Sequence, residues 1–403
     1  MNILHTSDWH LGKHLEGFSR IEEQEQFIEF LIESCDENKV DVLIVSGDIF
    51  DTSNPPSKAE SLYYKALKRL SKDGTRLIII ISGNHDNPER LGASSPLARE
   101  LGIVICDLPG AIKAVDSIGA FEVLSSSDTH MEFLVKGEKL RVGMLPYPSE
   151  SRLNDSFEYD YAEESAQLEY SKRVGLIFEK MDENFDEDGY NIAISHLFVI
   201  GGNTSDSERP IQLGGGLLVN PKDLPKKADY IALGHLHKPQ KVKVENGICR
   251  YSGSPIEYSR SEAKHTKLIL LIDTSNKDVI KEIVVPNFKP IQVWKTKSIS
   301  EAIELCREHS EENSYVYIEI ETDRIIDVTE LKEMKTLKSD IISIVPIFTE
   351  SEETIKAENI EDKSISELFK DFYIHVNKSD PDEKIMNAFN EIVHGEGEED
   401  EAN

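Results

Sequence analysis

The sequence predicts an α/β fold with a layered core, followed by a small second domain that combines α and β structure. Three observations lead to this prediction. Apolar segments typical of buried strands alternate with segments of helical periodicity. Residues able to bind a metal ion stand at the ends of five of these strands. Pro286 and Pro290 then separate this part from shorter elements.

The core strands are the clearest elements, because they are apolar along most of their length. They are expected at 2–8, 40–48, 75–86, 190–196 and 229–237. Uninterrupted apolar strands are typical of sheets that are covered on both faces. Shorter alternating strands are expected from about 104 to 148, and a hairpin turning at Glu245–Asn246–Gly247 is expected within 240–255.

Helical periodicity appears in three segments of the same part, near 19–36, 57–72 and 160–184. The first two begin with the spacing of a capping box, formed by Ser19 with Glu22 and by Ser57 with Glu60. We therefore expect these side chains to cap the two helices.

The chain divides into three expected parts, residues 1–287, 288–350 and 351–403. The second contains strand patterns around helices near 298–309 and 328–337, which predicts an α+β domain. The third begins with a polar linker and ends in an acidic tail that we expect to be disordered. Between them, one amphipathic helix carries an apolar face of Ile365, Leu368, Phe369, Phe372 and Tyr373. This face either packs on the second domain or docks on a partner's coiled coil, and the linker favours the partner.

Composition indicates a globular protein of the cytoplasm. The net charge of the 403 residues is −30, no apolar run has the length of a membrane span, and the N-terminus lacks a signal-peptide pattern. The four cysteines are far apart, which excludes a thiolate zinc site and fits a reducing compartment. The negative charge argues against passive binding of nucleic acids.

The side chains at the strand ends indicate a metal centre. In an open α/β sheet, functional residues gather beyond the carboxyl ends of the strands, so these side chains are expected to meet in one cleft. A lone aspartate or histidine at such a place is more often a cap or a satisfied polar group; the complete set indicates function. The seven candidate ligands are Asp8, His10, Asp48, Asn84, His196, His235 and His237.

The two histidines in "GHLH" have a local reason to act together. In an extended strand, alternate side chains share a face, so His235 and His237 are expected to point the same way, with Leu236 facing inward.

The ligand types predict the metal and the reaction. Carboxylates, an amide and imidazoles without thiolates suit borderline divalent ions such as Mn²⁺, Fe²⁺ or Zn²⁺. Seven ligands exceed the needs of one tetrahedral ion but suit two ions that share Asp48. Paired metals are typical of phosphoester hydrolysis. His85, next to Asn84, is the candidate acid that protonates the leaving alkoxide.

The motifs "DWH", "GDIFD", "GNHD", "ISH" and "GHLH" resemble those of the calcineurin-like metallophosphoesterase superfamily. More narrowly, "HTSDWHLG", "GDIFDTSNPPS", "SGNHDNPERL", "GGNTSDSERP" and "YSGSPIEYS" resemble the SbcD family of nuclease subunits. The resemblance implies a four-layer β-sandwich flanked by helices, with a small α+β capping domain. Protein phosphatases of the superfamily carry an arginine after the second aspartate and GNHE, where this chain has Asp51–Thr52 and GNHD.

The resemblance also implies roles for the candidate residues. One metal would bind Asp8, His10, Asp48 and His237, and the other Asp48, Asn84, His196 and His235, while His85 takes the position of the family's catalytic histidine. Archaeal relatives carry a second histidine where this chain has Asp51, so a role for that position is not carried over.

The family's activity is implied as well. It is Mn²⁺-dependent 3′–5′ exonuclease action on double-stranded DNA ends and endonuclease action on single strands or hairpins, in DNA repair, recombination and replication. A homodimer within a heterotetramer with an SbcC-type coiled-coil ATPase is the implied assembly.

Several basic residues near the motifs are candidates for contacts to DNA phosphates. Lys13, Arg90, Arg209 and Lys238 are adjacent to metal motifs, and the hairpin adds Lys241, Lys243 and Arg250. For the hairpin lysines, a solvated face is an equal alternative. Given the charge of −30, a partner is expected to supply much of the DNA-binding surface.

Two other functions are weighed against the nuclease. A stand-alone phosphodiesterase for nucleotides or other small molecules needs neither the second domain nor the C-terminal helix. A scaffold that has lost its chemistry is opposed by the complete ligand set.

Overall fold

The structure is a computed structural model. It describes residues 1–112, 115–156, 166–208, 217–277, 279–348, 364–377, 380–381, 384–387 and 389. The chain forms two compact units, residues 1–320 with 326–346 and residues 321–325 with 347–403. Among the described residues, no helix has both the length and the apolar character that a bilayer span requires.

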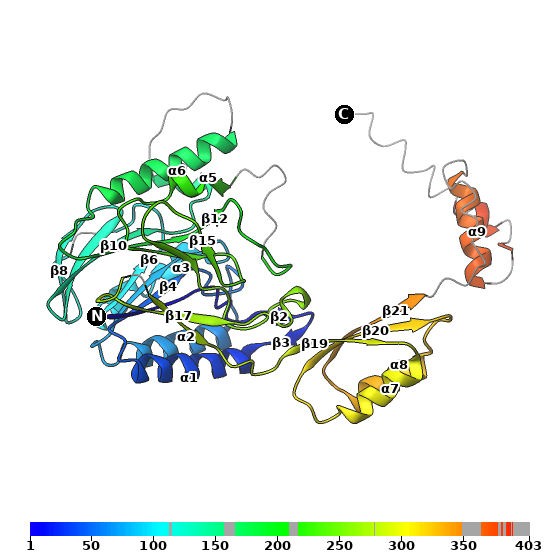
Figure 1. Ribbon diagram of the computed structural model, residues 1–403. Coiled ribbons are helices and arrows are strands. Elements are labelled where there is room, and N and C mark those ends of the chain that lie inside the picture. Colours follow the sequence, from blue (N-terminus) through cyan, green and yellow to red (C-terminus); the bar gives the residue numbers. More distant parts are fainter. Residues whose placement is uncertain are drawn as a thin grey trace. The chain divides into compact units, whose positions relative to one another are not determined.

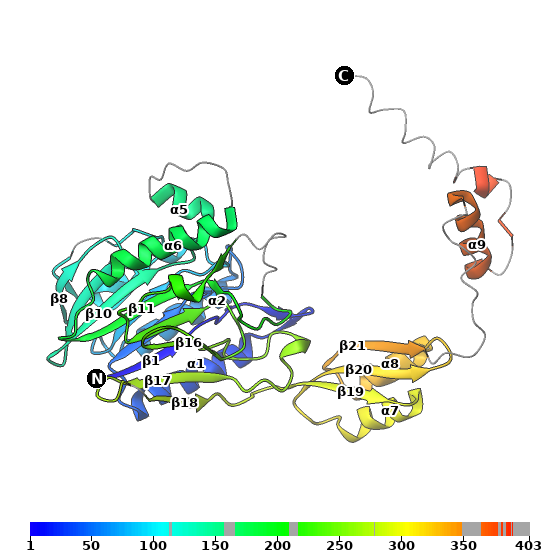
Figure 2. The same ribbon diagram turned by 45° about the horizontal axis from the view of Figure 1, so that its top comes forward.

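Two sheets form the centre of the first unit. The six-stranded sheet has the order β18 (Ile280–Val284), β17 (Leu268–Asp273), β1 (Asn2–Thr6), β4 (Val42–Ser46), β5 (Leu77–Ile81), β6 (Ile103–Cys106). Its strands β1, β4, β5 and β6 are parallel to one another. Strand β17 runs antiparallel to β1, and the edge strand β18 runs antiparallel to β17 (Figure 2). The parallel strands are buried along their whole length apart from half-buried Asn2, as their apolar sequences predict.

The eight-stranded sheet has the order β15 (Gln240–Val242), β16 (Ile248–Tyr251), β14 (Tyr230–Gly234), β11 (Tyr190–His196), β10 (Glu138–Leu145), β9 (His130–Val135), β8 (Phe121–Ser126), β7 (Ser117–Ile118). Strands β10, β11, β14 and β16 are parallel to one another. The strands β15 and β16 form the predicted hairpin.

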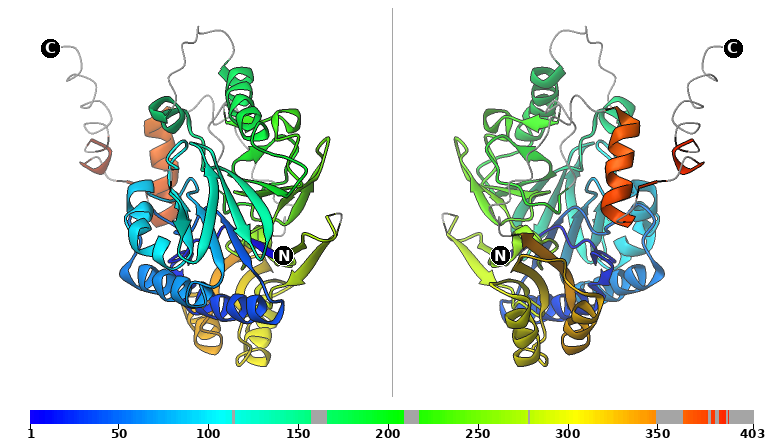
Figure 3. Two further views of the ribbon diagram at one scale, coloured as in Figure 1. Left: turned by 90° about the vertical axis from the view of Figure 1, so that its left-hand side faces the viewer. Right: turned by 90° about the vertical axis from the view of Figure 1, so that its right-hand side faces the viewer.

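Helices cover the outer faces of both sheets. Helices α1 (Ile21–Glu37) and α2 (Ser57–Leu70) pack on the six-stranded sheet, and α6 (Ala166–Asp182) packs on the eight-stranded sheet. The helices therefore lie on opposite sides of the strands (Figures 1 and 3). The inner faces meet in an apolar core that includes Ile44, Ile79 and Phe133. The order helix, sheet, sheet, helix confirms the four-layer fold.

Shorter elements complete this part of the unit. They are β2 (His14–Leu15), β3 (Phe18–Ser19), α3 (Pro88–Gly92), α4 (Ser95–Glu100), α5 (Glu150–Ser156), β12 (Phe198–Val199), β13 (Leu218–Val219), and the 3₁₀ turns η1 (Pro221–Asp223) and η2 (Arg260–Glu262).

The predicted capping boxes of the first two helices are wrong. The residue before α1 is Arg20, whose side chain makes no capping bond, and Ser19 belongs to the short strand β3. Pro56 precedes α2 and fixes its entry without a side-chain cap. The matching letters therefore lie one residue out of the register that capping requires.

The C-terminal side of the first unit contains a smaller α+β arrangement. A sheet of β19 (Ile291–Thr296), β20 (Tyr315–Thr322) and β21 (Ile341–Phe348) packs against α7 (Ile299–Glu308) and α8 (Val328–Leu337). Asp327 caps α8 in a full capping box with Glu330. Both helices lie where their periodicity predicts them, within one residue.

Contacts join this arrangement to the preceding residues. Ile291, Tyr315 and Tyr317 pack with Leu15, and the guanidinium of Arg260 forms an ion pair with Glu319. The backbone N–H of Ile291 donates to Glu257.

Helix α9 (Ile365–Asn377) belongs to the second unit. Ser364 and Glu367 cap it reciprocally, and Phe369 stacks on Phe389 with ring centroids 3.9 Å apart. Of the predicted apolar face, Ile365 is exposed and Leu368, Phe369 and Tyr373 are half-buried; the side chain of Phe372 lies outside the described residues.

We predict that Phe133→Ala lowers the free energy of unfolding by about 3–5 kcal/mol, because it leaves a cavity between the sheets. Phe133 is fully buried, whereas Leu97, with 72% of its surface exposed, offers a matched control. Leu97→Ala should change the value by less than about 0.5 kcal/mol. Urea titrations of the full chain measure both, and equal effects would contradict the packing.

Candidate metal centre

The predicted ligands gather at one end of both sheets. Asp8 and His10 follow β1, Asp48 follows β4, and Asn84 follows β5, all in the six-stranded sheet. His196 ends β11, and His235 and His237 follow β14, in the eight-stranded sheet. The centre therefore lies between two sheets, whereas the sequence predicted the rim of one.

An unusual backbone presents several of these side chains. Asp8, His10, Asp48 and His235 have φ values of 55°, 45°, 52° and 101°. Non-glycine residues rarely adopt such values, and their cost of about 1–3 kcal/mol each must be offset by neighbouring bonds. The N–H of Asp8 donates to the Gly47 carbonyl (3.0 Å), and that of His235 donates to the carboxylate of Asp8 (2.9 Å).

Position 83 requires glycine because the backbone there lies very close to the side chain of Asp48. A Cβ atom there would lie 2.1 Å from Oδ1 of Asp48. The same Oδ1 accepts the backbone N–H of His85 at 2.9 Å. The "SGNHD" loop thus closes directly on the Asp48 carboxylate, which only glycine allows.

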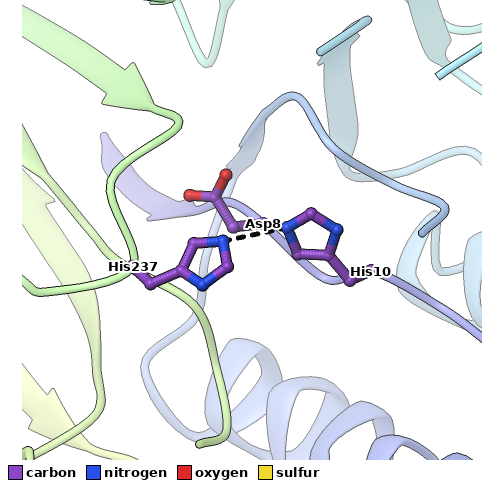
Figure 4. A group of neighbouring side chains, drawn as sticks. All are labelled: Asp8, His10 and His237. Atoms are coloured by element: carbon purple, nitrogen blue, oxygen red, sulfur yellow. Dashed lines mark hydrogen bonds between the residues drawn. The ribbon is translucent and has the colours of Figure 1, made fainter. Parts of the chain in front are cut away.

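Asp8, His10 and His237 form the first group of donors (Figure 4). The Nε2 atoms of the two imidazoles are 3.0 Å apart, and one donor atom from each residue lies within 4.8 Å of the others. All three side chains are fully or almost fully buried. Two ring nitrogens facing each other beside a carboxylate suit a borderline divalent cation.

Asn84, His196 and His235 form the second group. The Oδ1 atom of Asn84 lies 2.9 Å from Nε2 of His196 and 3.0 Å from Nδ1 of His235. The other nitrogen of His196 is held by the Ser46 carbonyl at 2.8 Å, which fixes the ring.

Asp48 joins the two groups. Its Oδ2 is 3.6 Å from Nε2 of His10 and 3.4 Å from Nε2 of His196. One carboxylate between two sets of nitrogen and oxygen donors fits a pair of divalent ions. The donor chemistry of this chain therefore fits the metals that its sequence predicts.

Burial and neighbouring charges shift the pKa values of Asp8 and Asp48 in opposite directions. Burial raises the pKa of Asp8 to about 6, despite the opposing influence of His196 and His237. Burial acts on Asp48 in the same direction, but the charges of His196 and His85 outweigh it and hold its pKa well below the ordinary value. We conclude that Asp48 is the carboxylate that stays ionised.

The pKa values of two histidines, His235 and His196, are also shifted in opposite directions. Burial lowers the pKa of His235 to about 3, and the neighbouring His196 adds to this effect. Burial also opposes protonation of His196, but the carboxylate of Asp48 raises its pKa to about 9.

His85 lies beside the first group, with its ring centroid 4.6 Å from that of His10. Its Nδ1 is 2.6 Å from the backbone carbonyl of Asp51. This contact places the Nδ1 proton on the carbonyl side and fixes the plane of the ring. The Asp51 side chain in turn accepts from Lys13 at 2.7 Å.

The predicted DNA-binding residues differ in their surroundings. Lys13 is held by Asp51, and exposed Arg90 pairs with Glu60 at 2.9 Å. Lys238 is exposed directly after His237. Arg209 falls outside the part of the chain that the structure describes.

The strand argument for His235 and His237 is wrong in its local reason. Strand β14 ends at Gly234, and both histidines lie beyond it. The positive φ of His235 breaks the extended alternation. The two rings reach the centre from a turn, while Leu236 is buried in the core as expected.

Glu262 is the functional candidate that sequence reasoning missed. Its buried carboxylate accepts from Ser207 and Lys267, and Ser207 Oγ lies 2.5 Å from Nδ1 of His237. Because the Ser207 hydroxyl donates to Glu262, it accepts from Nδ1–H of His237, which leaves Nε2 as the ligand nitrogen. Glu208 accepts the backbone N–H of His237 at 2.8 Å.

We call the chain of contacts from His237 through Ser207 to Glu262 the relay, and the charges around it support it. Burial would raise the pKa of Glu262, but the Lys267 cation and His237 hold it well below the ordinary value. Burial opposes protonation of His237, but the carboxylate of Glu262, 3.5 Å from its Nδ1, raises its pKa. In a chain with 75 acidic residues, no sequence signal separates this buried carboxylate from the exposed ones.

Comparison with known proteins agrees with this geometry. Residues 1–239 match the model of the calcineurin-like phosphoesterase family, and residues 287–377 match that of the type 5 capsule protein repressor C-terminal domain. The SbcD subunit of the nuclease SbcCD of Bacillus subtilis (strain 168) is 38% identical in an alignment of 404 positions that covers 99% of this chain and 100% of the relative.

Two solved structures are more distant. An archaeal phosphodiesterase covers 70% of this chain and 99% of its own, with a TM-score of 0.32 and 13% identity. A dimetal phosphatase from Danio rerio covers 71% of this chain and 99% of its own, with a TM-score of 0.37 and 10% identity.

We predict that Glu262→Gln weakens metal binding by about 10- to 100-fold, as expected when the partner of a ligating histidine is lost. Ser207→Ala removes the relay but keeps the Glu262–Lys267 pair, so it should act similarly without unfolding the loop. Glu304 is exposed, so Glu304→Gln serves as the control and should leave metal binding unchanged. Calorimetric titration with Mn²⁺ measures the affinities; unchanged binding in both relay variants would contradict the role of the relay.

Proposed function

Because the chain belongs to the calcineurin-like phosphoesterase family and to its SbcD branch, we propose that it is a DNA nuclease subunit that hydrolyses phosphodiester bonds. The observation that carries this proposal is the meeting of seven donor side chains from two sheets, with Asp48 between the two groups. The near full-length similarity to a nuclease subunit supports DNA as the substrate.

The seven predicted ligands would hold two divalent ions. Asp8, His10, Asp48 and His237 would bind one ion, and Asp48, Asn84, His196 and His235 would bind the other; the short contacts within each set support this division. We propose Mn²⁺ as the metal. Carboxylate, imidazole and amide ligands suit Mn²⁺ better than they suit the ions that prefer thiolates. When bound, such a pair polarises the phosphoryl group and activates water.

His85 is proposed as the acid that protonates the leaving oxygen. Its Nδ1 contact to the Asp51 carbonyl orients the ring, so that the opposite nitrogen carries the exchangeable proton. The edge-to-face contact with His10, at 4.6 Å between ring centroids, keeps the ring next to the first donor group. Burial of the centre between the sheets excludes bulk water from these groups.

We further propose the family's activities and assembly for this chain. These are 3′–5′ exonuclease action on duplex ends, endonuclease action on single strands or hairpins, homodimerisation, and a complex with an SbcC-type ATPase in DNA repair. The net charge of −30 supports the need for a partner, because it opposes DNA binding by the chain alone. Lys13, Arg90, Arg209 and Lys238 remain proposed phosphate contacts.

A division of labour along the chain accompanies this proposal. Residues 1–287 would carry the nuclease centre, 288–350 the capping domain, and 351–403 the linker and partner-binding helix. The half-buried Phe369 and Leu368 of α9 support a docking face.

The function is tested with end-labelled duplex DNA and Mn²⁺, with and without the ATPase partner. We expect progressive shortening of the DNA that requires the metal and increases with the partner. A generic phosphodiester reporter serves as the comparison. Hydrolysis of the reporter without attack on DNA under either condition would favour a small-molecule phosphodiesterase and refute the nuclease.

Two histidine variants separate chemistry from metal binding. His85→Ala should retain both metals and lose about 10²–10⁴-fold in cleavage rate, the usual contribution of a general acid. His237→Ala should instead lower the bound metal, because it removes a donor of the first group. Elemental analysis and cleavage rates measure both, and full activity of the His85 variant would show that the acid is another group.

A further inference from the structure

A basic cleft lies at an edge of the sandwich, where the two sheets end in β15 and β18. Its volume is about 450 Å³. We call it the edge cleft, and its walls include Lys241, Lys243, Ile248, Arg250, Ile280 and Glu282. None of these residues belongs to the metal centre.

Strand register explains why the cations share one wall. Lys241 and Arg250 are directly paired between β15 and β16, so their side chains project from the same face of the sheet. Lys243 follows Lys241 by two residues and lines the same cleft. The intervening Val242 packs on the opposite side with the outer core.

Charge in the edge cleft runs against the protein as a whole. Three cationic side chains face a single carboxylate there, although the chain carries a net charge of −30. Glu282, on β18, accepts from Nη2 of Arg250 at 2.6 Å and so links the two sheets. This pair neutralises one cation and leaves the charges of Lys241 and Lys243 uncompensated within the cleft walls.

Arg250 retains hydrogen-bonding capacity. Its side chain is almost fully buried, since only 3% of the residue's surface is exposed. Its Nε is buried and has no acceptor among the described residues. Buried donors without partners are uncommon, because leaving their hydrogen bond unmade costs free energy.

We propose that the edge cleft is a phosphate-binding site separate from the metal centre. Lysine and arginine side chains around a concave wall are the groups that bind phosphate. In extended backbone the two lysines are about 6.8 Å apart, which equals roughly two nucleotide steps of one DNA strand.

Two sources supply this chemistry, a free nucleotide and the backbone of a nucleic acid. The backbone source rests on the proposed function, since a nuclease must hold the strand that it cuts. Lys238, directly after the metal-centre residue His237, leads into β15 and so connects the two places along the chain. The phosphate site itself needs no metal chemistry.

Binding is measured on the full chain in EDTA, which prevents cleavage. Inorganic pyrophosphate and deoxynucleoside monophosphates are titrated calorimetrically, and fluorescent single-stranded and duplex oligonucleotides by anisotropy over a series of salt concentrations. The test variant is Lys241→Gln/Lys243→Gln, and the matched control is Lys332→Gln/Lys335→Gln on exposed positions of α8. Glu282→Gln supplies a change in the opposite direction.

We expect the Lys241/Lys243 variant to lose binding, the α8 control to match the unaltered chain, and Glu282→Gln to bind at least as tightly. For oligonucleotides, the slope of log affinity against log salt should fall by about 1.4–1.8, the contribution of two phosphate contacts. Loss with small phosphates alone identifies a nucleotide site, and loss with oligonucleotides identifies a backbone site.

Equal binding by the Lys241/Lys243 variant and the unaltered chain, or no binding by either, would overturn the inference. Neither outcome bears on the nuclease, because metal-dependent cleavage by the unaltered chain is measured separately. Conversely, a chain that binds oligonucleotides through this cleft but never cuts them would refute the nuclease and leave the phosphate site standing.

Discussion

The buried carboxylate of Asp48, held where two sheets end together, is the constraint on which the rest of the centre depends. It stands between the nitrogen donors of His10 and His196, and the "SGNHD" loop closes on its other oxygen. An ionised group in such a place is costly unless cations and donors surround it. The glycine at position 83 follows from the need to bring the chain that close.

The sequence predicted much of this because the determining signals are local. An apolar strand with a polar end can be recognised from a single segment of the sequence. Each predicted ligand lies in the metal centre. What failed depends on contacts between distant segments. The sheet that carries His235 is not the one that carries Asp48, and a buried strand looks the same in either. Likewise, Ser19 has capping letters, yet it pairs in a strand with His14.

Glu262 illustrates the same limit from the other side. Its role comes from burial beside Lys267, in the same segment, and beside Ser207, which a distant loop brings to it. In sequence it is one acid among 75. The net charge is a poor guide to local binding for a related reason. The value of −30 says nothing of where the charges lie, neither the buried carboxylates of the centre nor the basic wall of the edge cleft. Local fields between fixed groups, rather than net charge, decide what can bind.

The segment from Glu257 to Lys267 connects the metal centre to the α+β arrangement of β19, β20 and β21. Tyr258 places its ring 5.6 Å from that of His10, and its hydroxyl donates to the Trp9 carbonyl. Arg260 reaches Glu319, and Glu257 accepts from Ile291, both in the arrangement of β19 and β20. Residues that contact the donor side chains and residues that contact the β19–β20 arrangement thus alternate along one stretch. A displacement of the β19–β20 arrangement would strain the same backbone that aligns Glu262 with His237, because the buried side chains of Glu257, Tyr258, Glu262 and Lys267 hold this segment in place.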